Sequence, residues 1–69
     1  MVNVLLQGPE SECEYGSKVM DVGAGADYLK LLKSVASIWV NGEQVVYNDD
    51  ALNINSDGSL FLNVYTKTL

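Results

Sequence analysis

Apolar residues recur at every second position near the start of the chain, which is the period of a β-strand. This pattern covers residues 1–7, and a second strand is expected over 17–22, with Met20 and Val22 facing the core. Between the two lies the acidic segment 8–16, which contains glycine near both ends and one proline. Glycine and proline interrupt regular structure, so this segment is predicted to be a loop.

The period changes to that of a helix after the second strand. Apolar residues then follow the spacing i, i+3, i+4 and i+7 of one helical face: Tyr28, Leu31, Leu32 and Val35. The small residues of 23–27 are predicted to break the preceding strand. Asp27 is predicted to cap the helix, because its carboxylate can accept hydrogen bonds from the free N–H groups of the first turn.

Asn41-Gly42 predicts a tight β-hairpin, since both central positions of such a turn need a positive φ. The turn pairs Val40 with Glu43, Ile38 with Val45, and Ala36 with Tyr47. One face then carries Ala36, Ile38, Val40, Val45 and Tyr47, and the other carries Trp39, Gln44 and Val46. The boundary between the helix and this hairpin stays open near 35–38.

A second hairpin is expected around Asp57-Gly58. A two-residue turn would mix polar and apolar residues on both faces. A three-residue loop at 56–58, with Gly58 left-handed, separates them, and this register is therefore predicted. It gathers Leu52, Ile54, Leu60, Leu62 and Val64 on one face, and leaves Phe61 and Tyr65 beside Asn53, Asn55 and Asn63 on the other. Asp49-Asp50 is expected to be a turn before Ala51.

The order strand, strand, helix and four strands predicts an α+β domain spanning residues 1–69. We expect a small antiparallel β-sheet of about five to six strands, with two tight hairpins and one packed α-helix. Neither the strand order nor the sheet face that the helix covers follows from the pattern.

A chain of 69 residues is short for a stable core, and such domains gain stability from disulfides, metals or self-association. Cys13 is the only cysteine, which excludes an internal disulfide, and the absence of histidine excludes the usual zinc ligand sets. No metal or cofactor is expected. Self-association remains, so we expect a homodimer or a higher oligomer.

The formal net charge is −5, from nine acidic residues against four lysines, and there is no arginine. Such a chain is a poor candidate for binding nucleic acid, whereas it can attract a basic protein partner. No apolar stretch approaches the length that a membrane helix needs, and the first residues lack a secretory signal. The single cysteine favours the reducing cytoplasm.

The segment 19–27 resembles the first glycine motif of Rossmann-type methyltransferases, in which a strand runs through a Gly-x-Gly turn into a helix. Asp27 occupies the third glycine position, and the alternating strands and helices of that fold need more than 69 residues. We therefore reject a methyltransferase. A glycine turn before a helix can still bind an anion, which makes four residues candidates for ligand binding: Gly23, Ala24, Gly25 and Asp27. The alternative is a plain strand-to-helix turn.

Two further patterns offer little chemistry. Asn53-x-Asn55-x-Asp57-Gly58 matches half of an EF-hand loop, but Val64 replaces its last ligand, so an asparagine-rich hairpin is favoured over calcium binding. Cys13 lies between Glu12 and Glu14, which disfavour the reactive thiolate, and no histidine can activate it. The protein is therefore expected not to be an enzyme.

The aromatic residues give the main functional hypothesis, because aromatics exposed on a small protein mark interfaces. We expect a protein-binding module, by analogy an inhibitor of a host defence enzyme encoded by a phage or mobile element and acting in the host cytoplasm. Its expected interface comprises Glu10, Glu12, Glu14, Trp39, Tyr47, Phe61 and Tyr65. One alternative is an oligomeric protein that sequesters a nucleotide-like small molecule. Another is a structural subunit that assembles through its sheet edges.

Overall fold

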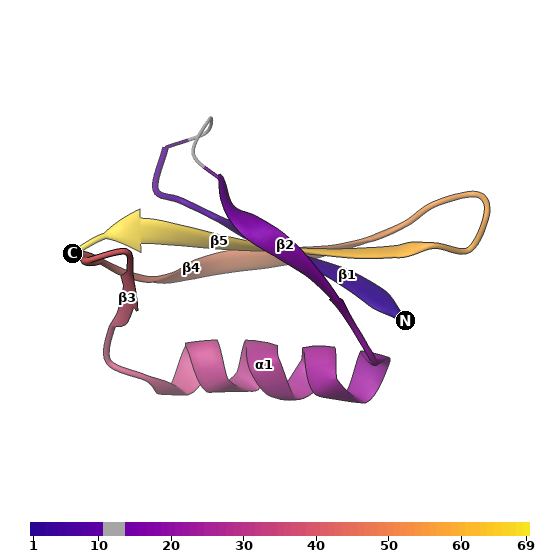
Figure 1. The fold of residues 1–69 in the computed structure, drawn as a ribbon, viewed down its shortest axis with the longest axis horizontal. Coiled ribbons are helices and arrows are strands. Elements are labelled where there is room, and N and C mark those ends of the chain that lie inside the picture. Colours follow the sequence, from indigo (N-terminus) through magenta and orange to yellow (C-terminus); the bar gives the residue numbers. More distant parts are fainter. Residues whose placement is uncertain (11–13) are drawn as a thin grey trace.

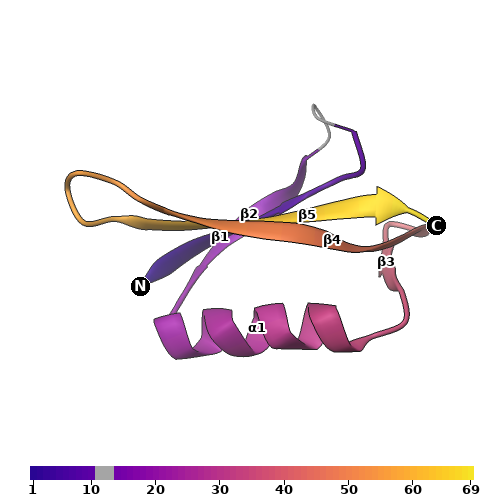
Figure 2. The same ribbon diagram turned by 180° about the vertical axis from the view of Figure 1, so that it is seen from behind.

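The computed structural model describes residues 1–10 and 14–69. The elements are β1 (Val2–Gln7), β2 (Glu14–Met20), α1 (Val22–Ser34), β3 (Ile38–Val40), β4 (Glu43–Ile54) and β5 (Leu60–Thr68). The five strands form one sheet in the order β2-β1-β5-β4-β3, and α1 lies against one face of it (Figures 1 and 2). The α+β class with one helix is confirmed.

The sheet is mixed, which corrects the expectation of an antiparallel sheet. β1 runs parallel to β5, with Val2 opposite Leu60, whereas every other neighbouring pair is antiparallel. A parallel pair needs a long connection between its two strands. The chain from β2 through α1 to β4 supplies this connection, so the first and last strands lie side by side in the middle of the sheet.

Both hairpin registers predicted from the sequence are confirmed. In the first hairpin Ile38 lies opposite Val45, and the turn residues Asn41 and Gly42 have φ values of 52° and 83°. In the second, Leu52 faces Leu62 and Ile54 faces Leu60, with Gly58 at φ 87°. The pairing of Ala36 with Tyr47 is wrong, because β3 begins only at Ile38.

β4 is one long strand, so three strands follow the helix where four were expected. The predicted turn at Asp49-Asp50 is wrong, because the strand continues through both residues after a bulge between Tyr47 and Asp49. Two hydrogen bonds hold the acidic pair in the strand. The Tyr47 hydroxyl donates to Asp50 Oδ1 (2.6 Å), and the Asp50 N–H donates to Asp49 Oδ1 (2.8 Å).

The second strand ends before 23–27, as predicted, but these residues do not form a break ahead of the helix, because the helix begins at Val22 and includes them. The Gly25 N–H donates to the carbonyl oxygen of Asp21 (2.8 Å), which closes the first helical turn. Asp21 is the N-cap residue, although its side chain makes no capping hydrogen bond. Asp27 lies inside the helix and therefore does not cap it.

The helix also turns a different face to the sheet from the one predicted. Gly25 and Leu32 are buried, Tyr28 and Leu29 are half-buried, and Leu31 is 59% exposed. Close approach at Gly25 explains this rotation, because a Cβ atom there would lie only 2.8 Å from Val2 Cγ1. The side chains of Val22 and Val35, predicted to face the core, are exposed as a result.

The core lies between α1 and the central strands. Its buried residues are Val2, Val4, Leu32, Leu62 and Val64, and Val45 is buried further along the same sheet face. The buried Thr66 hydroxyl donates to the carbonyl oxygen of Gln7 (2.7 Å), which ties β5 to the end of β1. Within the described residues, no helix has the length and apolar character needed to cross a membrane.

Candidate binding surfaces

The sheet face opposite α1 carries three of the aromatic residues predicted to form an interface. Trp39 on β3 pairs with Gln44, and Phe61 and Tyr65 lie on the same face of β5. Trp39 is 64% exposed, whereas Phe61 and Tyr65 are half-buried by their neighbours on the sheet. No helix of the described chain covers this face (Figures 1 and 2). We call it the open face.

Amide side chains surround the aromatics of the open face. Phe61 lies between Asn53 on β4 and Asn3 on β1. The amide oxygen of Asn3 is buried and accepts no hydrogen bond from the described part of the chain. A partner cannot reach this buried atom, whereas the side chain of Asn53 is exposed. The open face therefore combines apolar area with an accessible amide that can exchange hydrogen bonds with a partner.

A hollow of about 330 Å³ lies at one end of the sheet. It brings Glu10 and Tyr65 together, two residues predicted to belong to one interface, and adds Asp49. Two carboxylates beside an aromatic ring suit a basic side chain. Sequence reasoning missed Asp49, because the residue was assigned to a turn and not to a strand.

The remaining predicted interface residues lie elsewhere. Glu14 is exposed at the start of β2, and Glu12 falls outside the described residues, as does Cys13, which was predicted to be unreactive and not part of the interface. Tyr47 lies on the helix-covered face, away from Trp39, with the Lys33 Nζ 5.5 Å from the centre of its ring. Its hydrogen bond to Asp50, reinforced by desolvation and by the nearby acidic charges, raises the pKa of Tyr47 to about 12.

The residues predicted to bind a small ligand do not form a glycine loop. Gly23, Ala24, Gly25 and Asp27 all lie in α1. Gly25 is buried against Val2, whereas the other three are exposed. The predicted turn is thus the first part of the helix, in which Gly23 and Ala24 lie in the first turn at the N-terminal end, and binding of an anion there stays a prediction.

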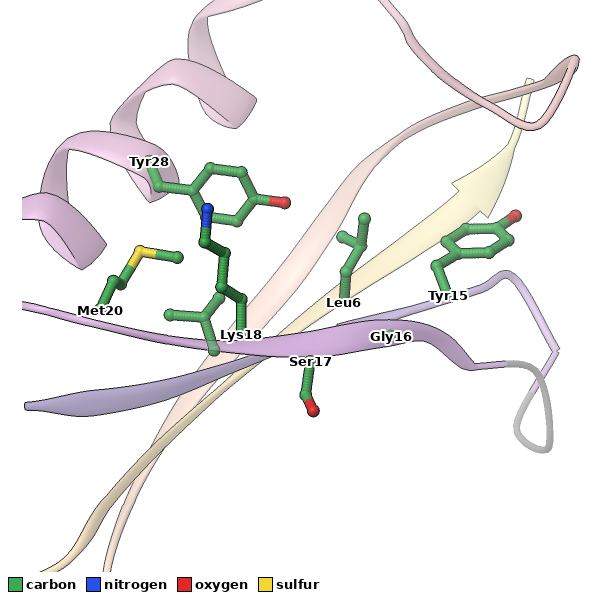
Figure 3. Close-up of a pocket in the computed structure, with 8 residues that line it drawn as sticks. Leu6, Tyr15, Gly16, Ser17, Lys18, Met20 and Tyr28 are labelled. Carbon is green, nitrogen blue, oxygen red and sulfur yellow. The ribbon is translucent and has the colours of Figure 1, made fainter.

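Each flank of α1 borders a hollow, because one helix is too narrow to cover five strands. Figure 3 shows the hollow on the β2 side, of about 300 Å³, where Tyr28 from α1 faces Lys18 and Met20 from β2. Leu6 and Tyr15 line its other end, while Ser17 points away. Two aromatic rings and an amine around an apolar floor suit a small planar anion.

The hollow on the β4 side is almost entirely apolar and has about the same volume, 300 Å³. We call it the apolar groove. Its lining consists of Val2, Val22, Gly25, Ala26, Leu29, Asp50, Leu52, Leu60 and Leu62. Asp50 is its one charged residue, and Val22 and Leu52 are each more than half exposed. Sequence reasoning missed the groove, since the pattern placed Leu52 on an apolar sheet face but did not indicate which face the helix covers or how far it extends.

The half motif of an EF-hand is a hairpin loop, as predicted. The Asp57 carboxylate accepts hydrogen bonds from the Ser59 hydroxyl (2.6 Å) and N–H (2.9 Å), and these bonds lower the pKa of Asp57. Among residues 1–10 and 14–69, no three His, Cys, Asp or Glu side chains are grouped to hold a metal ion. Comparisons with models of protein families, with curated proteins and with solved structures find no match for this chain.

Proposed function

We propose that this protein is a non-enzymatic protein-binding module and that the open face is its interface. The observation that carries the proposal is the exposure of Trp39 on a sheet face that also bears Phe61 and Tyr65. Tryptophan and tyrosine are the residues most enriched among those that dominate binding energy. A β-sheet holds them rigidly, so little conformational entropy is lost when a partner covers them.

The partner is proposed to present a basic segment. Glu10 and Asp49 lie at the hollow beside Tyr65, and the whole chain carries a net charge of −5. Opposite charges accelerate the encounter and fix its orientation, while an aromatic ring next to the carboxylates adds attraction for a lysine or arginine. The hydrophobic contact would then come from Trp39 and Phe61.

A module of this kind acts by covering its partner. If the covered surface is the active site of an enzyme, binding inhibits that enzyme. We propose that a phage or mobile element encodes the protein and uses it in this way to inhibit a host defence enzyme. The unpaired Cys13 supports action in the cytoplasm.

The proposal is tested by capturing proteins from a host lysate with the wild-type chain and three variants. Trp39→Ala and Tyr65→Ala remove open-face aromatics, and Leu31→Ala removes an exposed apolar residue from α1 as the matched control. A specific partner should be retained by wild type and Leu31→Ala. Its affinity for either open-face variant should fall at least about 30-fold, as expected for the loss of roughly 2 kcal/mol.

Circular dichroism and thermal melting show whether the variants remain folded. Equal capture by folded Trp39→Ala, Tyr65→Ala and control proteins would refute the open face as the interface. Because Trp39 is the only tryptophan, its emission gives a second readout with the purified partner. A blue shift on binding indicates that the partner covers the ring.

A second candidate function, binding of a nucleotide-like molecule, is favoured by the hollow in Figure 3. Tyr28 could stack on a base while Lys18 neutralises a phosphate, and a volume of about 300 Å³ lies at the lower end of small-molecule sites. Titration with nucleotides should then shift the amide signals of β2 and of the first half of α1, and Lys18→Ala should weaken the effect. No change at millimolar nucleotide would eliminate this function.

A further inference from the structure

β2 is an outermost strand of the sheet, and within the described residues no other strand pairs with its outer edge (Figure 1). It has seven residues, from Glu14 to Met20, whereas β3 at the other edge has only three. An edge strand offers a row of N–H and C=O groups that can pair with a further strand. The longer edge of this sheet is therefore open to the addition of a strand.

The hollow of Figure 3 lies directly beside this edge. Lys18 pairs with Val4, which is buried, so the Lys18 side chain lies on the helix side of the sheet. Gly16 and Met20 lie on the same side, because they are two residues away in each direction. A Cβ atom added at Gly16 would meet no atom within 4 Å, so there is open space at this point of the edge. A strand added to β2 would therefore place alternate side chains over the hollow.

The charge at this edge selects an acidic partner. Lys18 is exposed and is the only charged residue that lines the hollow. A lysine on an edge strand disfavours pairing with a strand that lacks a complementary charge, whereas a carboxylate directly opposite stabilises the pair. The nearest acidic residues along the described chain, Glu14 and Asp21, are at least three positions away, roughly 10 Å in extended backbone. Physiological salt screens charges beyond about 8 Å, so the net charge of −5 does not keep a carboxylate from Lys18.

The positions on either side of Lys18 favour apolar side chains. Met20 is half-buried, and Val4 and Leu6 form the floor of the hollow. A large apolar side chain opposite Gly16 meets no side chain of that residue and can reach this floor. When a peptide adds to a sheet edge, main-chain hydrogen bonds give affinity and pockets for alternate side chains give specificity. β2 and the hollow supply both.

We propose that the outer edge of β2 binds an extended segment of a partner protein, which adds antiparallel to β2. The segment carries an acidic residue opposite Lys18 and large apolar residues opposite Gly16 and Met20. The site lies at the opposite edge of the sheet from Trp39 on β3. The proposal therefore goes beyond the interface proposed for the open face and can be tested separately from it.

The test uses an acetylated and amidated nine-residue peptide of threonine, with glutamate at its centre and leucine two residues to either side. Titration followed by NMR should shift the amide signals of residues 16–20 and leave the Trp39 indole signal unchanged. A peptide with lysine at its centre should bind about 3- to 30-fold more weakly, because a like-charge pair replaces an opposite-charge pair. Lys18→Glu should reverse this preference, whereas the control Lys30→Glu, at an exposed position of α1, should keep it.

Two N-methylated peptides test the main-chain contacts. Alternate residues of an added strand point their N–H groups to β2, so of two peptides methylated at alternate residues, one should lose binding and the other should keep it. Circular dichroism confirms that each protein variant is folded. Trp39→Ala should bind the peptide as wild type does, which separates failure of this site from failure of the open face.

Several results would overturn the proposal. One is the absence of any shift in residues 16–20 at millimolar peptide. Others are equal binding of the two methylated peptides, or a charge preference that Lys18→Glu leaves unchanged. A wild-type chain that dimerises through β2 without peptide would assign the edge to a second copy instead. Nucleotide binding in the hollow without peptide binding would assign it to a small molecule.

Discussion

Replacing Gly25 by alanine tests the way in which α1 packs on the sheet. A new Cβ atom at this position would lie 2.8 Å from Cγ1 of Val2, whereas carbon atoms in contact stay about 3.5–4.0 Å apart. Val2 is only 5% exposed and has a branched, stiff side chain on a central strand, so it cannot swing away. The helix must therefore move outward by roughly 1 Å.

Two opposing effects set how much folding stability Gly25→Ala loses. Alanine favours a helix over glycine by about 1 kcal/mol, whereas overpacking a core costs about 1–3 kcal/mol. Gly23→Ala isolates the first effect, because Gly23 lies in the same helix with no atom within 4 Å of its added Cβ. Gly25→Ala should therefore be less stable than Gly23→Ala by about 1–3 kcal/mol.

Urea unfolding followed by circular dichroism measures both free energies on the same protein background. Equal stability of the two alanine variants would contradict the close approach of Gly25 to β1. Val2→Ala provides a further check, since it removes the clashing methyl group. In the double variant the cost of Gly25→Ala should shrink, giving a coupling energy that a helix placed elsewhere would not produce.

Two further predictions concern polar groups. Thr66→Val keeps the side-chain shape but removes the hydroxyl that donates to the Gln7 carbonyl. It should lower the free energy of unfolding in urea by about 1–2 kcal/mol, whereas the control Thr68→Val, at an exposed position, should change it by less than about 0.5 kcal/mol. Equal losses in the two variants would argue against this hydrogen bond. In an ultraviolet titration of phenolate, one tyrosine should ionise near pH 12, and Tyr47→Phe should abolish that step. Because the folded pKa of Tyr47 lies above the unfolded value of 10.0, its hydrogen bond to Asp50 should stabilise the fold fully below pH 10, and this stabilisation should be lost as the pH rises towards 12. Simultaneous ionisation of all four tyrosines would contradict the raised pKa of Tyr47.

The hairpins could be predicted because their information is local. Asn41-Gly42 strongly favours a turn with two positive φ values, and the alternation of Leu52, Ile54 and Leu60 allows only one register to keep a face apolar. The same alternation predicted which aromatic side chains lie on the opposite face of the sheet. Trp39 and Tyr65 were therefore assigned to one type of surface without knowledge of the strand order.

The helix start could not be predicted in this way. Glycine lowers helix stability, so a segment with Gly23 and Gly25 reads as a break. In the folded protein Gly25 lets α1 approach β1 closely, and this tertiary contact outweighs the local preference. The apolar residues of α1 also extend beyond one narrow face, so the spacing of Leu31 and Val35 indicated a side that the fold leaves exposed.

The binding surfaces depend on contacts between distant parts of the chain. The hollow beside Tyr65 requires the loop after β1 to meet the bulge of β4 at Asp49. The apolar groove depends on how far the β4–β5 hairpin extends past a helix of 13 residues. Neither relation appears in the periodicity of a single segment.

The pairing of β1 with β5 also sets the order in which the protein can fold during synthesis. The first strand has no partner at the centre of the sheet until residues 60–68 have left the ribosome. Before that moment, the β1–β2 hairpin and α1 lack Leu62 and Val64, the two residues that β5 contributes to the core. Contacts between sequence-distant strands form slowly, so completion of the core awaits this one closure, and the chain is most prone to aggregate before β5 has joined β1.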